Sequence, residues 1–448
     1  MTLKQLLFLD QYDPNLATWV YISALLTIGI YFKFNRVWSV RNLDLALLIS
    51  LAPALLLLEQ GNEAAEWAGH VWLIVASGCL LVRLLVDPLM VRRPLLEPNL
   101  TTGGLTFMGA ALLIFLMTNV ITGERIKNDS KASMTAVQAS AQSSDAPRIP
   151  GRGNGYPLFE FFEGLSRHAA GQTDEASPRE AQLAADRVLS ALAIFAHLSV
   201  VFGLLVIGYW HYGNIKTGVA AAALYLLLPY TSLMTKVPHL SVDHLLPSAL
   251  LVWAIVAYRR PLISGALLGL AAGAIFYPVF LLPLWAGFYW QRGLARFLIG
   301  FTVTLLICLG LLVVSTGSIH AVLNGIREAF AWSQDSHGFW SMLESLWNVD
   351  RVWRIPVLTA FFALAASFAL WPAQKNLGTL LSCSAAVMLG TQFWLAHGGG
   401  PYMGWYLPLV LLTVFRPNLE DRVALAVLGE GNWFQRRRQP ARSIKMAA

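Results

Sequence analysis

Ionisable and aromatic side chains gather in five short segments of a chain that is otherwise strongly apolar. Their carboxylates can take a proton from an attacking hydroxyl, and their Arg, Lys and His side chains can neutralise a phosphate. Aromatic neighbours can stack on sugar rings or anchor at a membrane surface. The five groups are Glu160, Glu163 and Arg167; Lys236, His239, Asp243 and His244; His320, Arg327 and Glu328; Asp335, His337, Arg351 and Arg354; and His397 to Tyr402.

Each group also has a purely structural interpretation. Charges in loops outside a membrane are often solvated, aromatic residues often form an interfacial belt, and Gly398–Gly400 can form a tight turn. Asp243 and His244 are the strongest chemical candidates, because two adjacent ionisable groups stand directly before an apolar run, where burial costs free energy.

Motifs of soluble enzymes are absent from the sequence. It contains no phosphate-binding Gly loop with Lys, no Cys/His spacing typical of a metal site and no nucleophile elbow. The three cysteines lie inside apolar runs, which indicates packing rather than a disulfide framework. We therefore expect no cofactor, no metal ligands from these motifs and no ATP-driven pump, and the sequence leaves a divalent metal open.

Composition places the chain in a membrane. It has 448 residues, of which 56% are hydrophobic and 13% charged, and its mean hydropathy is +0.57; soluble domains have about 25% charged residues. Apolar runs recur that are long enough to cross a bilayer, which predicts an all-α polytopic protein with roughly 11–13 transmembrane helices. Because the Lys and Arg residues cluster at the ends of these runs, the net charge of +7 predicts orientation rather than nucleic-acid binding.

Charge alternation predicts the orientation. Lys33 and Arg36 follow the first apolar run, Glu59 and Glu63 follow the second, and Arg92 follows the third. Basic loops remain on the cytoplasmic side. We therefore expect a multi-pass protein of the cell (inner) membrane, with the N-terminus outside and the C-terminus in the cytoplasm.

The same pattern divides the chain into six segments. They are a four-span region (1–120), an external loop (121–187), a central membrane region (188–314), an external segment (315–352), three C-terminal spans (353–416) and a basic cytoplasmic tail (417–448). In the first loop, residues 128–155 are polar without an apolar period, which predicts disorder. The following residues place their apolar side chains on one helical face, as an amphipathic helix on the membrane surface would.

Residues 261–291 have arginines at both ends, Arg259–Arg260 and Arg292. A single helix would place one of these ends outside, whereas two short helices that meet near Tyr277 keep both inside. The sequence therefore predicts a hairpin.

Residues 239–301 resemble the polyprenyl-phosphate-mannose-dependent branch (glycosyltransferase family 87) of the GT-C type integral-membrane glycosyltransferases. Residues 401–408 look like the aromatic-Pro entrance of a late span in the same family. Ile275 and Phe276 stand where the family has a basic residue before Tyr-Pro. The residues that carry the resemblance are Ser241-Val242-Asp243, Arg259-Arg260, Gly265 to Gly269, Phe276-Tyr277-Pro278, Leu281-Leu282-Pro283 and Arg292-Gly293.

The resemblance implies a GT-C-like fold and transfer of a sugar, with mannose expected, from a polyprenyl-phosphate donor to a lipid or cell-envelope glycan at the extracytoplasmic face. The expected catalytic base is Glu160, Glu163 or Asp243. The expected substrate-binding residues are Lys236, His239, His244, Arg351, Arg354, Tyr277, His397 and Tyr402. The alternative is a non-enzymatic multi-pass protein, either a transporter subunit or an envelope assembly scaffold; a transporter should have polar residues at mid-depth along a path for its solute.

Overall fold

The computed structural model describes nine stretches of the chain, and the fold is given for these. They are residues 16–60, 63–90, 96–122, 178–236, 238–290, 292–316, 354–373, 375–395 and 403–417. Within them the regular elements are α-helices and short 3-10 helices, with no strand. The expected all-α class is therefore confirmed. The predicted disordered loop, its amphipathic helix, most of the second external segment and the basic tail lie outside the described residues.

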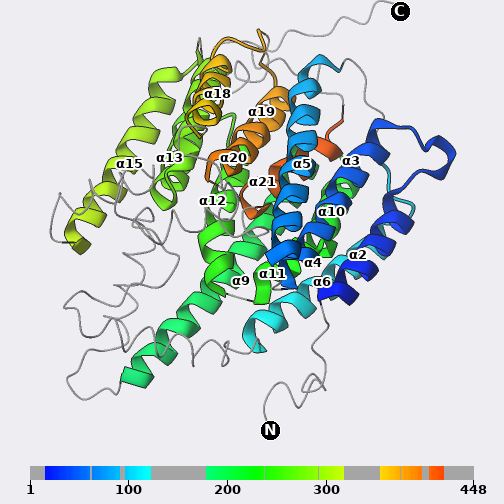
Figure 1. The fold of residues 1–448 in the computed structure, drawn as a ribbon. Helices are drawn as coiled ribbons and strands as arrows, with labels where there is room; N and C mark the ends of the chain where they lie inside the picture. Colours follow the sequence, from blue (N-terminus) through cyan, green and yellow to red (C-terminus); the bar gives the residue numbers. More distant parts are fainter. Residues whose placement is uncertain are drawn as a thin grey trace, which may run out of the picture.

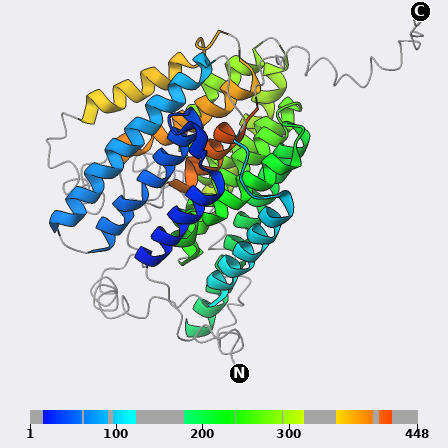
Figure 2. The same ribbon diagram turned by 90° about the vertical axis from the view of Figure 1, so that its right-hand side faces the viewer.

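The helices run side by side as one bundle, with the N-terminal helices along one flank (Figures 1 and 2). The N-terminal elements are α2 (Leu16–Tyr31), η1 (Phe34–Arg36), α3 (Val40–Ser50), α4 (Ala52–Glu59), α5 (Glu63–Val86), η2 (Asp87–Leu89) and α6 (Thr102–Thr122). The central elements are α9 (Pro178–Trp210), α10 (Ile215–Leu227), α11 (Pro229–Lys236), α12 (Pro238–Val256), α13 (Pro261–Ala274), η3 (Tyr277–Leu281), α14 (Leu282–Tyr289) and α15 (Leu294–Thr316). The C-terminal elements are α18 (Arg354–Ser367), α19 (Leu377–Gly390), α20 (Gln392–Leu395) and α21 (Met403–Phe415).

Several helices have the length and composition to cross a membrane. Among the described residues there are 5 such helices, or up to 6 if α10 and α11, which meet at an angle of 61°, form one broken span. Outward-facing apolar side chains such as Phe107 (77% exposed) and Leu25 (70% exposed) fit a lipid environment, because soluble proteins rarely expose wide apolar surface. The chain is thus an α-helical membrane protein.

Several of the 11–13 spans that the sequence predicts correspond to helices shorter than a full membrane crossing in the described part of the chain. Seven further apolar helices have 10–17 residues, which is less than a full crossing needs. Proline explains two of the breaks, because its ring removes a backbone donor and clashes with the preceding turn. Pro229 separates α10 from α11, and Pro278 stands in the break between α13 and α14.

Two C-terminal helices form the centre of the bundle. Every residue of α19 and of α21 is buried, and a helix that is apolar on all sides must be enclosed by others. In Figure 1 both lie in the middle of the bundle. The other helices therefore pack around a core that the last part of the chain provides.

The ends of several helices meet at one end of the bundle, which we call the basic end because Lys33, Arg36, Lys216, Arg259, Arg260 and Arg416 lie there. The Tyr212 hydroxyl donates to the Leu412 carbonyl at 2.7 Å, and His211 Nε2 lies 3.0 Å from the Val256 carbonyl oxygen. The Tyr31 ring at the end of α2 packs edge-on against Phe415. The basic residues that the sequence assigns to one side of a membrane thus share one end of the molecule.

Residues 261–291 turn back on themselves. Helix α13 ends at Ala274, Ile275 is extended, and η3 leads into α14. At the end of α14 the Tyr289 hydroxyl donates to the Tyr258 carbonyl at 2.6 Å, beside the start of α13. This is the arrangement expected of a hairpin with its tip at Tyr277 and both feet at the basic end.

Helices α13 and α15 pack with their backbones in contact. A methyl group placed on Gly265 would lie 2.1 Å from the Phe297 carbonyl oxygen, and one on Gly300 would lie 2.2 Å from that of Leu262. Small residues four apart, here Gly265 and Gly269, permit such close approach between membrane helices. The hairpin is therefore held against α15 by main-chain proximity.

Replacing Gly300 by Ala should destabilise the protein, since the added methyl group meets the backbone of α13. We expect the free energy of unfolding to fall by about 1–3 kcal/mol, with a lower midpoint of thermal unfolding in detergent. Gly310 on the same helix has no atom within 4 Å of the methyl position, so Gly310→Ala is the control and should leave the midpoint unchanged. Equal effects of the two substitutions would contradict the close packing.

Candidate functional site

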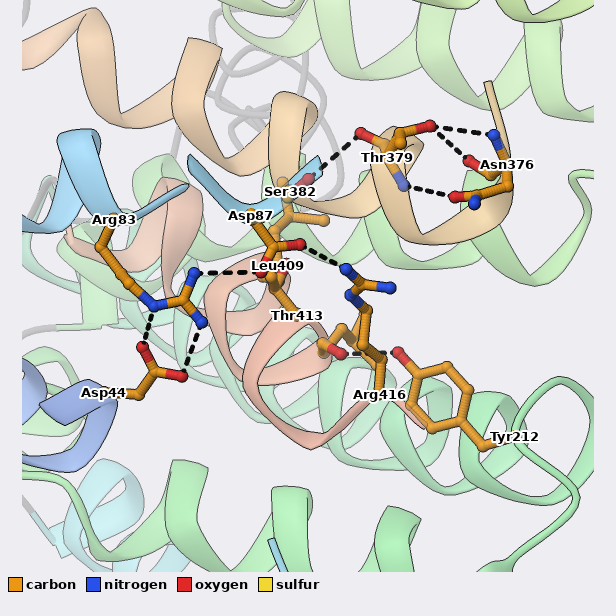
Figure 3. A network of polar contacts seen from close by, with 11 residues as sticks. Asp44, Arg83, Asp87, Tyr212, Asn376, Thr379, Ser382, Leu409, Thr413 and Arg416 are labelled. Carbon is orange, nitrogen blue, oxygen red and sulfur yellow. Dashed lines mark hydrogen bonds and ion pairs between the residues drawn. The ribbon is translucent and has the colours of Figure 1, made fainter. Parts of the chain in front are cut away.

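Four charged side chains form an ionic network at the basic end (Figure 3). Arg83 holds both oxygens of Asp44, with Nε 2.6 Å from Oδ1 and Nη2 3.0 Å from Oδ2. Its Nη1 lies 3.1 Å from Oδ1 of Asp87, and Nη2 of Arg416 lies 2.6 Å from Oδ2 of Asp87. Among the described residues these four are the buried charged side chains, and their charges cancel.

The network joins three parts of the chain. Asp44 is in α3, Arg83 is in α5, Asp87 begins η2 four residues later, and Arg416 follows α21 directly. Gly378 leaves space for the Arg416 side chain, because a methyl group on Gly378 would lie 2.2 Å from Arg416 Nη1. The network therefore ties the N-terminal helices to the end of the central helix α21.

The network leaves little chemistry for a substrate. All four carboxylate oxygens of Asp44 and Asp87 already contact a guanidinium nitrogen. A carboxylate held by Arg on both oxygens is a poor general base and a poor ligand for a transported cation. We assign this network to structure and look for the functional site elsewhere.

Inside the bundle, away from the basic end, three aromatic side chains from distant segments come together. The Trp405 ring lies 4.9 Å from the Tyr277 ring and 5.5 Å from the His244 ring, measured between centroids. All three side chains are buried, with 0%, 8% and 6% of their surfaces exposed. The start of α12, the tip of the hairpin and the start of α21 therefore meet at what we call the aromatic cluster, His244, Tyr277 and Trp405.

A glycine allows the contact between α21 and α12. A methyl group on Gly404 would lie 2.9 Å from Met234 Sδ and 3.3 Å from His244 Cβ. With hydrogen at this position, the first turn of α21 reaches the end of α11 and the start of α12. Trp405, the next residue, then lies against His244 and Tyr277.

A second set of polar groups surrounds the next residue of α21. The buried Tyr406 hydroxyl faces the Gln392 and Ser77 side chains, yet none of the three polar groups makes a hydrogen bond of standard geometry within the described part of the chain. Tyr230 of α11 also lies near Tyr406 and donates its hydroxyl to the Leu48 carbonyl. Buried polar atoms of this kind are usually satisfied by a neighbour or by water, and Gln392 and Ser77 are the polar neighbours of the Tyr406 hydroxyl.

The predicted site residues are brought together in part. His244 and Tyr277 share the aromatic cluster. Lys236 ends α11, and His239 and Asp243 lie in the first turns of α12, so their backbones stand next to it. Arg354 begins α18, the helix whose Phe361 packs on the hairpin residue Phe280 at 5.1 Å. The remaining candidates lie outside the described residues; they are Glu160, Glu163, Arg351, His397 and Tyr402.

The sequence does not single out Trp405 as a site residue. Residues 401–408 contain three aromatic side chains, and the sequence analysis names Tyr402 because it belongs to the polar group His397 to Tyr402. The signal for Trp405 is its place one residue after Gly404, where a helix can approach its neighbour closely. Tyr406 is the next residue of the same helix, but its side chain faces Gln392 and Ser77 instead of the aromatic cluster.

No group of three His, Cys, Asp or Glu side chains among the described residues lies close enough together to hold a metal ion. The three cysteines are free, with Cys308 and Cys383 buried and Cys79 exposed. Comparison of the chain with protein-family models, with curated proteins and with solved structures found no match. The functional assignment therefore depends on the residues and their geometry.

Removing Arg83 should destabilise the fold strongly, because Asp44 and part of Asp87 would then be buried without compensation. For Arg83→Gln we expect a loss of about 3–5 kcal/mol in unfolding free energy, measured by thermal or denaturant unfolding in detergent.

The double variant Asp44→Asn/Arg83→Gln should recover part of this loss, since it removes both members of one ion pair. Arg36→Gln is the control, because Arg36 is exposed at the same end, and it should leave stability unchanged. If the loss of unfolding free energy in the double variant equals the sum of the losses in the two single variants, the pairing of Asp44 with Arg83 is contradicted.

Proposed function

We propose that the chain is a membrane glycosyltransferase of the GT-C type that moves a sugar, with mannose as the first candidate, from a polyprenyl-phosphate donor to a lipid or cell-envelope glycan. The observation that supports this most is the aromatic cluster. Residues 239–301 and 401–408, which carry the resemblance to this class, are far apart in the sequence, yet Tyr277 and Trp405 lie 4.9 Å apart. The candidate base Asp243, in the first turns of α12, directly precedes His244 of this cluster.

In the proposed reaction a carboxylate takes the proton from the acceptor hydroxyl as its oxygen attacks the anomeric carbon of the donor sugar. The bond from that carbon to the phosphate oxygen breaks, and the polyprenyl phosphate leaves with the electron pair. Asp243, Glu160 or Glu163 serves as the base. A cation among Lys236, Arg351 and Arg354 neutralises the leaving phosphate.

The remaining candidates would position the sugar. His239, His244 and His397 offer ring nitrogens, and Tyr277 and Tyr402 offer a hydroxyl and an aromatic face. The Trp405 ring packs against both Tyr277 and His244 and is fully buried, so it would hold these two rings in place.

The distribution of charge disfavours an ion-coupled transporter. Such proteins place charged side chains at mid-depth along the path of the ion. Among the described residues, the buried charges all belong to the neutral network at the basic end. The buried His197 pairs with the Tyr225 hydroxyl at 2.9 Å, as a histidine of the core would. A non-enzymatic scaffold is the remaining alternative.

The proposal includes an orientation. The basic end faces the cytoplasm, as the distribution of Lys and Arg favours, and the start of α12 with its candidate base then faces the extracytoplasmic side of the inner membrane. The polyprenyl chain of the donor would lie in the bilayer beside the helices, and its phosphate would lie at the outer rim.

Purified full-length protein should transfer mannose from a polyprenyl-phosphate donor to a lipid or glycan acceptor. One of the variants Asp243→Asn, Glu160→Gln and Glu163→Gln should lower kcat by about 10²–10⁴-fold, because a positioned general base contributes that much, while the other two should change it little. Product formation measured by chromatography with a labelled donor decides between them.

Glu97→Gln is the matched control, because Glu97 is an exposed carboxylate whose charge acts on Arg41, beside the basic end. It should retain full activity. If the stable wild-type protein transfers no sugar from any polyprenyl-phosphate donor, the glycosyltransferase proposal fails and the scaffold alternative replaces it.

A further inference from the structure

Two turns at the basic end carry four arginines, Arg259, Arg260, Arg292 and Arg296, which we call the arginine patch. One turn joins α12 to α13 and the other joins α14 to α15. A methyl group on Gly293 would lie 2.9 Å from Pro261 Cγ, and Gly293 has φ +117°, a conformation that favours glycine. The two turns are therefore in contact, and the four cations gather in a small area.

The arginine patch has no acidic partner among the described residues. The sequence contains no Asp or Glu between Asp243 and Glu328, and no described carboxylate forms an ion pair with any of the four arginines. The Arg259 guanidinium carbon lies 5.9 Å from the centroid of the Tyr258 ring, which does not offset its charge.

Four other basic side chains at this end have partners within the protein. Arg83 and Arg416 are paired with carboxylates. Lys33 donates to the Asn99 side chain at 2.9 Å, and Lys375 donates to the Ala369 carbonyl at 2.9 Å. Among the described residues the arginine patch is thus a cluster of four cations without a carboxylate partner, as a site for an anionic ligand requires.

The surroundings of the arginine patch are apolar and exposed. Arg296 stands at the head of a stripe on α15 that continues through Ile299, Val303 and Leu306, which are 56%, 50% and 61% exposed; residues three or four apart share one helix face. Across the contact with α13, Leu262 is 50% exposed. A cationic head above an apolar stripe matches a molecule with an anionic head group and hydrocarbon chains.

We propose that the arginine patch binds an anionic phospholipid, with its phosphate among the guanidinium groups and its acyl chains along α15. Arg suits this role because its planar fork binds phosphate oxygens in pairs. Basic clusters at the membrane surface attract anionic lipids electrostatically, and here the lipid would clamp the feet of the hairpin to the start of α15. The proposal is independent of the proposed catalytic function.

The test uses delipidated full-length protein in detergent and measures binding by native mass spectrometry and by the shift in unfolding midpoint. The probes are dioleoyl-phosphatidylglycerol, dioleoyl-phosphatidylcholine and inorganic phosphate. The wild type should bind phosphatidylglycerol in preference to phosphatidylcholine. The double variant Arg260→Gln/Arg296→Gln should weaken phosphatidylglycerol binding by about 30-fold, because each basic residue near an anionic lipid surface contributes a similar amount of binding free energy and two are removed.

The matched control is Arg36→Gln/Lys216→Gln, which removes two charges elsewhere at the basic end and should change binding less than twofold. Arg296→Gln alone serves if the double variant is unstable, and should weaken binding by an intermediate factor. The proposal is overturned if the control and test variants lose phosphatidylglycerol binding equally, or if neither loses it. It is also overturned if inorganic phosphate competes for the site as well as the lipid does.

Discussion

Two carboxylates and two guanidinium groups buried in an apolar bundle must neutralise one another, because an unpaired charge in such surroundings costs several kcal/mol. Asp44, Arg83, Asp87 and Arg416 meet this requirement in a single alternating row. The row fixes where α21 ends, and Gly404 fixes where it begins by allowing contact with α11 and α12. The central helix is thus positioned at both ends, and the aromatic cluster depends on it.

The hairpin supplies the other half of the aromatic cluster. Its two helices are too short to cross a bilayer, so its tip lies inside the bundle, where Tyr277 reaches Trp405. Ile275, which stands near the tip, is fully buried. An apolar side chain suits this place, because a basic one would be buried without a carboxylate beside it.

Much of this arrangement is predictable from the sequence. Apolar run length predicts an all-helical membrane protein, charge alternation predicts a common basic end, and paired arginines around 261–291 predict a chain reversal near Tyr277. The sequence also names His244 and Tyr277 as site residues, although it does not show that they share Trp405. That contact depends on tertiary packing at Gly404, which no local pattern reports.

The ionic network is harder to predict for the same reason. Asp44, Arg83 and Asp87 are visible as charges near the ends of apolar runs, but Arg416 lies 329 residues beyond Asp87 and belongs to an ordinary basic flank. Among the described residues there are also fewer full-length spans than composition predicts. Hydropathy measures apolar length, whereas the breaks at Pro229 and Pro278 shorten the helices that result.

The position of Arg416 also has a consequence for biosynthesis. A ribosome makes the chain from the N-terminus, so Asp44, Arg83 and Asp87 enter the membrane with a net negative charge long before Arg416 is made. Until α21 inserts, one oxygen of Asp87 lacks its cation and the middle of the bundle lacks its core helix. Asp44, Arg83 and Asp87 therefore complete their charge balance only after the end of α21, the last described helix, has been made.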